Sequence, residues 1–137
     1  MFDFKDVLVI SRRVVPRYTD LTPEEVCDMF QSAQKIGRVI EREYNGSSLT
    51  IAMQDGPAAG QTVPHCHVHV IPRKFGDWAN NDDIYKDIDK LKLATIYQAK
   101  ENSTLFKIDN EERKPRSIEE MAKEAEFLRQ FFEQSEM

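Results

Sequence analysis

The three histidines of the chain occupy alternate positions of one short stretch, residues 65–69 (HCHVH). Near neutral pH an imidazole ring can act as a nucleophile, a proton donor or acceptor, or a metal ligand. On a β-strand successive side chains point to opposite faces, so His65, His67 and His69 would share one face, with Cys66 and Val68 on the other. The pattern predicts a strand that is anchored in the core on one side and carries chemistry on the other. Cys66 is therefore expected to be a core residue and not a nucleophile.

One interpretation of the histidines is a metal site, because imidazole is a common zinc ligand. At about 3.3 Å per residue the Cα atoms of His65 and His69 would lie roughly 13 Å apart, too far for both rings to bind one ion unless the strand bends sharply. Two histidines with a distant Asp, Glu or Cys remain an alternative. The sequence supplies no obvious third ligand, so we predict no metal site and no tightly bound cofactor.

The other interpretation is attack on phosphorus. His67, at the centre of the row, would be a neutral nucleophile whose ring is oriented by a hydrogen bond from its second nitrogen. His65 and His69 would donate to the phosphate oxygens and to the departing group as negative charge develops. We therefore predict His67, His69 and His65 as catalytic residues.

Donors that suit a phosphate precede the histidines. Gly60, Gln61 and Thr62 offer backbone amides, a side-chain amide and a hydroxyl, and Gln54 ends the preceding segment on its polar side. Any hairpin loop can contain glycines, so the specificity of this set comes from its closeness to the histidines. We predict these four residues as substrate-binding.

Three strands are expected around the site. The apolar run 7–10 (VLVI) predicts a buried strand, the alternation in 48–54 (SLTIAMQ) predicts a strand with one apolar face, and 65–71 (HCHVHVI) is the histidine strand. The turn formers of residues 55–64 predict a loop between the second and third strands.

Three helices complete the expected layout. Thr22 and Glu25 form a capping box that starts a long helix at Pro23, and this helix ends before residues 45–46 (NG). A short helix is expected at 82–93, and a second capping box at Ser117 opens an amphipathic C-terminal helix. The fold class is therefore α+β, an antiparallel sheet with one long helix and a C-terminal helix.

The 137 residues fit a single domain, 1–137, and the formal net charge of −5 argues against general binding to nucleic acid or to an anionic membrane. No apolar run reaches the roughly 18 residues of a membrane span. The two cysteines and the acidic start of the chain favour a reducing compartment, so we expect a cytoplasmic protein that can also be nuclear.

The motif HCHVHVI matches the histidine triad signature, His-φ-His-φ-His-φ-φ with φ apolar, and QDGPAAGQTVPHCHVHVIPRK resembles the fragile histidine triad branch, the diadenosine polyphosphate hydrolases. The likeness extends to DLTPEEVCDMFQSAQKIGRVIE, GDWANNDDIY and SIEEMAKEAEFLR. It covers most of residues 7–88 and 117–129. Motifs of this length are far more specific than a lone His-x-His pair.

This resemblance implies a dinucleoside polyphosphate hydrolase that cleaves diadenosine triphosphate to AMP and ADP through a nucleotidyl-histidine intermediate. By position His67 corresponds to the nucleophile, Gln54 to a glutamine that contacts the scissile phosphate, and Gln61 and Thr62 to loop residues near the phosphates. The resemblance also implies a homodimer joined edge to edge. It implies no tightly bound metal, although Mg2+ commonly accompanies the nucleotide substrate.

The sequence departs from the family pattern in two places. The family has further strands before the run at 7–10, with a pocket asparagine and a histidine at the position of Asp6; the chain begins near that point. The connector 89–116 is longer than the family's and carries no matching motif. A nucleotide-binding or signalling module with little turnover is therefore an alternative function, and a nucleoside phosphoramidate hydrolase is a third, disfavoured by Gln54 and its context.

Overall fold

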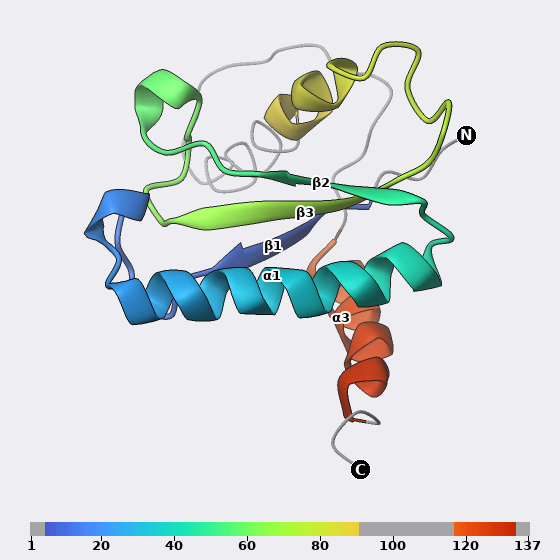
Figure 1. Ribbon diagram of the computed structural model, residues 1–137, viewed down its shortest axis with the longest axis horizontal. Coiled ribbons are helices and arrows are strands. Elements are labelled where there is room, and N and C mark those ends of the chain that lie inside the picture. The colour runs from blue at the N-terminus through green and yellow to red at the C-terminus, as the bar shows by residue number, and fades with distance from the viewer. Residues whose placement is uncertain (1–4, 91–116, 134–137) are drawn as a thin grey trace. The chain divides into compact units, whose positions relative to one another are not determined.

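The computed structural model describes residues 5–90 and 117–133, which belong to two compact units, residues 1–79 and 80–137 (Figure 1). The predicted single domain over 1–137 stays a prediction. Elements of the first unit follow one another as β1 (Val7–Ile10), η1 (Tyr18–Asp20), α1 (Pro23–Glu43), β2 (Ser48–Ala52), η2 (Pro57–Ala59) and β3 (His67–Arg73).

The sheet of the first unit is antiparallel in the order β1-β3-β2, so the histidine strand lies in the middle. Val9 of β1 is opposite Val68, and Ile51 of β2 is opposite Val70. Residues that are opposite one another share a face, so these apolar side chains lie together. Val68 and Val70 are fully buried, which anchors β3 in the core.

Helix α1 runs along this apolar face of the sheet (Figure 1). It begins with the predicted capping box: Glu25 N donates to Thr22 Oγ1 at 3.2 Å, and Thr22 N donates to Glu25 Oε2 at 2.8 Å. Its buried residues include Ala33 and Ile40, members of the predicted apolar face. The helix ends at Glu43 as the sequence indicates, so both of its ends are confirmed.

Strand ends differ from the prediction by two residues. β2 stops at Ala52 instead of residue 54, and β3 starts at His67 instead of residue 65. The cause is loop hydrogen bonding: Asp55 is held by the η1 segment, and Cys66 N donates to Val15 O at 2.8 Å. β1 is also less buried than predicted, because Leu8 and Ile10 are 51% and 56% exposed.

In the second unit residues 83–90 are helical, and α3 spans Ile118–Glu133. The second capping box is present, since Ser117 N donates to Glu120 Oε2 at 2.7 Å and Glu120 N donates to Ser117 Oγ at 3.1 Å. The end of the predicted helix at 82–93 and most of the connector 89–116 lie outside the described residues. The α+β class is confirmed. No described helix is long and apolar enough to cross a membrane.

Candidate active site

His67 and His69 lie next to one another on the sheet face opposite α1. Both side chains are buried, with 7% and 2% of the residue exposed. Their rings meet edge to face with centroids 5.2 Å apart and planes at 77°. The structure thus brings together two of the three histidines predicted as catalytic, in a position largely withdrawn from water.

The hydrogen bond of His67 determines which of its ring nitrogens can react. Nδ1 lies 2.7 Å from the backbone carbonyl oxygen of His65. A carbonyl only accepts hydrogen bonds, so Nδ1 must carry the hydrogen, and the lone pair of the neutral ring is then on Nε2. Nε2 is the nitrogen that a nucleophilic His67 would use.

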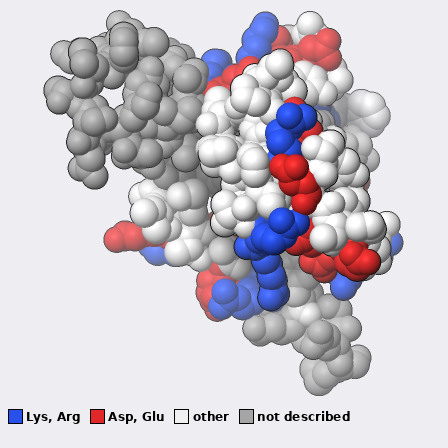
Figure 2. All heavy atoms as spheres, turned by 90° about the vertical axis from the view of Figure 1, so that its left-hand side faces the viewer, with Lys and Arg blue, Asp and Glu red and all other residues white. Residues whose placement is uncertain are grey.

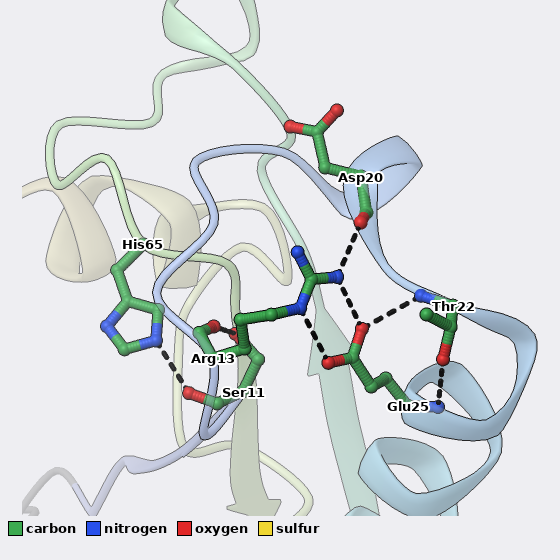
Figure 3. Close-up of polar contacts among 6 residues, drawn as sticks. All are labelled: Ser11, Arg13, Asp20, Thr22, Glu25 and His65. Carbon is green, nitrogen blue, oxygen red and sulfur yellow. Dashed lines mark hydrogen bonds and ion pairs between the residues drawn. The ribbon is translucent and has the colours of Figure 1, made fainter.

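His65 lies just before β3, so strand alternation does not orient its ring. Its Nε2 is 2.6 Å from the backbone oxygen of Ser11, to which it donates (Figure 3). Ser11 Oγ in turn donates to Arg13 O at 2.8 Å. His65 is therefore fixed by the segment that follows β1, while its backbone carbonyl orients His67.

Arg13 connects this segment to the start of α1. Its Nε and Nη2 donate to the two carboxylate oxygens of Glu25 at 2.9 and 2.7 Å, and Nη2 also donates to Asp20 O at 2.8 Å (Figure 3). The hydrogen bond from Arg13 lowers the pKa of Glu25 from 4.5 to about 2. Basic and acidic side chains lie side by side on the face shown in Figure 2. Arg13 and Glu25 were not predicted to matter for the site.

Asp55 fixes the start of the loop between β2 and β3. Its Oδ1 accepts from Tyr18 N at 2.6 Å and its Oδ2 from Arg17 Nη2 at 3.0 Å. Arg17 is the main reason that the pKa of Asp55 is lowered. Gly56 follows with φ +93°, and a Cβ there would lie 3.1 Å from Arg17 Cζ. Only glycine fits that backbone beneath the guanidinium without strain.

Gln61, predicted to bind substrate, holds the loop together with its side chain. Its Oε1 accepts from Gly56 N at 2.6 Å, and its Nε2 donates to Pro16 O at 2.7 Å and Val63 O at 2.8 Å. Both amide hydrogens are therefore used within the protein. Thr62, also predicted to bind substrate, is exposed. Phosphate contacts by these two side chains stay predictions.

Gln54 and Gly60 approach one another closely. A Cβ on Gly60, whose φ is +89°, would lie 3.0 Å from Gln54 Nε2. Gln54 follows Ala52, which is opposite His69, by two residues in the direction of His67. Its Oε1 is buried without a hydrogen-bond partner in the described part of the chain. Both residues are thus placed near the end of the sheet where His67 begins β3.

His69 is held by a residue that the sequence did not single out as functional. Its Nδ1 lies 2.8 Å from Asp6 Oδ2, and the two side chains are 3% and 6% exposed. Asp6 precedes β1 with the same parity as Leu8, which is opposite His69. That parity was the signal that could have predicted the contact.

Arg73 ends β3 in a buried ion pair with Asp77, where Nε and Nη2 donate at 2.7 and 3.0 Å. Arg73 Nη1 also donates to Thr50 Oγ1 at 2.9 Å, and Arg73 Cζ lies 4.5 Å from the centre of the Trp78 ring. The hydrogen bond from Arg73 is the largest cause of the lowered pKa of Asp77. This cluster fastens the far end of the histidine strand.

Residues 6–76, more than half of the chain, match the HIT domain family model. The chain belongs to the HIT domain family. It is 49% identical over 128 residues to the bifunctional bis(5'-adenosyl)-triphosphatase/adenylylsulfatase FHIT of Arabidopsis thaliana, covering 93% of this chain and 66% of that protein. It is 43% identical over 143 aligned positions to the asymmetrical bis(5'-nucleosyl)-tetraphosphatase of Schizosaccharomyces pombe, covering 95% of this chain and 79% of that protein.

Among solved structures, the crystal structure of the C. elegans NitFhit protein matches with a TM-score of 0.52 and 44% sequence identity. The match covers 64% of this chain and 21% of that one. The chain therefore spans about two thirds of the Arabidopsis protein and about a fifth of the C. elegans chain. These similarities agree with the resemblance stated from the histidine motif.

Two further expectations bear on the chemistry of this HIT domain. Among the described residues no group of three or more His, Cys, Asp or Glu is placed to hold a metal ion. Cys66 is 2% exposed, and burial raises the pKa of its thiol. The prediction that Cys66 is a core residue is confirmed.

Proposed function

We propose that this HIT domain protein is a dinucleoside polyphosphate hydrolase that cleaves diadenosine triphosphate to AMP and ADP. The observation that carries the proposal is the hydrogen bond of 2.7 Å from His67 Nδ1 to His65 O, which leaves the ring's lone pair on Nε2 in a buried position beside His69. The names of the Arabidopsis and fission yeast relatives, a triphosphatase and a tetraphosphatase, support the substrate class.

In the first step His67 Nε2 bonds to the phosphorus of one adenylyl group. The bond from that phosphorus to the bridging oxygen breaks, its electron pair leaves with ADP, and His69 Nε2–H supplies the proton to the departing oxygen. In the second step a water oxygen bonds to phosphorus, the P–N bond to His67 breaks, and the water proton returns to His69. The sum is diadenosine triphosphate plus water giving AMP and ADP.

Binding would be shared by the four residues predicted from the sequence, Gln54, Gly60, Gln61 and Thr62. Gln54 is the strongest of them, because its amide lies at the end of the sheet where His67 begins β3 and its Oε1 has no described partner. Gln61 would act indirectly by shaping the loop that presents Gly60. Mg2+ would arrive with the nucleotide and would not reside in the protein.

We also propose a homodimer and a cytoplasmic, partly nuclear location. Within the described residues β1 and β2 each pair only with β3, so each has an edge at which a second copy could continue the sheet. Both cysteines are free, which fits a reducing compartment.

The test compares the 137-residue chain with His67→Asn and with Asp28→Asn, a change on the exposed surface of α1. Diadenosine triphosphate, diadenosine tetraphosphate and adenylyl sulfate are each supplied with Mg2+. AMP release and the intact mass of the quenched protein are measured. We expect AMP release and an adenylyl adduct in the wild type and in Asp28→Asn, and a loss of at least about 10³-fold in His67→Asn with unchanged circular dichroism.

Full activity in His67→Asn would show that another group is the nucleophile. Nucleotide binding by the wild type without product or adduct would instead favour the alternative, a binding or signalling module. The ratio of rates for the three compounds would identify the preferred leaving group.

A further inference from the structure

Asp6 and His69 form a buried pair within the candidate active site. The distance from His69 Nδ1 to Asp6 Oδ2 is 2.8 Å, and both side chains are more than nine tenths buried. Burying a carboxylate is costly unless it is paired and hydrogen-bonded. The pair therefore needs an explanation beyond chance contact on a sheet surface.

The register of the sheet explains how two residues so distant in sequence meet. Leu8 is opposite His69, so Asp6 is its diagonal neighbour on the same face of the sheet. β3 is fixed in the centre by β1 on one side and β2 on the other. Asp6 is thus positioned by the same strand pairing that positions the histidines.

The pair fixes which nitrogen of His69 is presented to a ligand. An ionised carboxylate only accepts hydrogen bonds, so His69 Nδ1 carries a hydrogen whether the ring is neutral or charged. All change of protonation is then confined to Nε2. That nitrogen is a lone pair in the neutral ring and an N–H donor in the cation.

The hydrogen-bond partners of the pair are incomplete in an informative way. Among the described residues three buried polar side-chain atoms lack a partner, and they are Asp6 Oδ1, Gln54 Oε1 and His69 Nε2. Buried polar atoms are ordinarily satisfied, so an orphaned atom indicates a missing ligand or a functional role. A phosphoryl oxygen placed beside His67 would satisfy His69 Nε2, because the two rings are only 5.2 Å apart.

We propose that Asp6 is a positioning residue for this reaction. It keeps the hydrogen of His69 on Nδ1 and thereby aims Nε2 at the phosphoryl group that His67 attacks. The inference rests on the proposed function and names a residue that acts through His69 without touching the substrate. A carboxylate in this role parallels the aspartate that orients the histidine of a serine protease, where the amide replacement leaves the geometry intact but favours the wrong tautomer.

The test is the variant Asp6→Asn, whose side-chain amide can donate to Nδ1 and so allows the hydrogen of His69 to move to Nε2. We expect kcat on diadenosine triphosphate to fall about 10- to 100-fold with KM changed less than about threefold. Asp6→Glu, which keeps the carboxylate, should recover part of kcat. Asp28→Asn makes the same chemical change on the surface and should match the wild type.

Nitrogen-15 spectra of the imidazole rings provide a readout that a structural role would not move. With only three histidines in the chain, the His69 signals can be assigned with a His65→Gln sample. We expect Nδ1–H in wild-type His69, a mixture of tautomers in Asp6→Asn, and a shift of Nε2 on addition of AMP that weakens in the variant. An Nε2–H neutral tautomer in the wild type would overturn the inference even if Asp6→Asn failed to fold.

The two proposals fail in different ways. If the wild type hydrolyses the dinucleotide while Asp6→Asn has an unchanged kcat and an unchanged His69 tautomer, the role of Asp6 is refuted and the hydrolase stands. If the wild type releases no AMP from any substrate, the proposed function fails. In that case the orientation of His69 by Asp6 is still decided by the nitrogen-15 spectra with AMP.

Discussion

Gly56 shows how much a single residue can control in this site. Its φ of +93° and ψ of 163° belong to a region that side chains avoid, and the Arg17 guanidinium lies against it. We expect Gly56→Ala to lower the free energy of unfolding by about 1–3 kcal/mol. Catalytic efficiency should fall as well, because the loop that carries Gly60 and Gln61 starts here. Urea denaturation and kcat/KM measurements check both effects.

A matched control is Gly76→Ala. Gly76 also has a positive φ, +75°, but no described atom lies within 4 Å of the added Cβ. Its replacement should cost only the backbone strain, about 1 kcal/mol, with kcat/KM unchanged. Equal effects of the two substitutions on activity would contradict the role assigned to the Arg17 contact.

At this scale the sequence predicted the histidines, Gln54 and the core position of Cys66, because strand alternation and local motifs carry that information. It did not predict Asp6 or Arg13. The partner of Asp6 is 63 residues away in sequence and the partner of Arg13 is 12 away. Such contacts follow from strand pairing and from the path of the segment after β1, which the sequence pattern alone does not specify.

Among the elements, α1 and β2 approach most closely at Gly37. A Cβ there would lie 2.6 Å from Leu49 Cδ1, so a larger side chain must displace Leu49 or the helix. We expect Gly37→Val to lower the free energy of unfolding by about 1–3 kcal/mol despite the poor helix propensity of glycine. Gln34→Val, at an exposed position of α1, should change it by only a few tenths. Thermal unfolding of both variants measures the difference, and equal midpoints would refute the close packing.

The helices were predicted better than the strands for a physical reason. The signals that start and end α1 are local, since the capping box lies within four residues and the helix ends before Asn45, whose φ is +52°. Strand ends depend on partners. β2 stops early because Asp55 is held by Tyr18 N and Arg17, and neither contact could be read from the alternation of residues 48–54.

For the molecule as a whole, the Arg13–Glu25 pair predicts a feature of acid stability. The folded-state pKa of Glu25 is lowered from 4.5 to about 2, so its charge stabilises the fold fully above about pH 4.5. That contribution is lost as pH falls toward 2. Glu25→Gln should therefore be less stable than the wild type at pH 6, and the difference should vanish near pH 2. Denaturant midpoints between these pH values test this, and a difference independent of pH would contradict it.

The position of β3 between its two neighbours also governs how the backbone of the site moves. Because β3 is paired on both sides, its amides can exchange hydrogen with solvent only when the sheet opens. Deuterium uptake at His67 and His69 would then report the slowest opening of the first unit and not a local fluctuation. Adjustment to substrates of different length must consequently come from residues 55–66, while the reacting imidazoles stay on a rigid backbone.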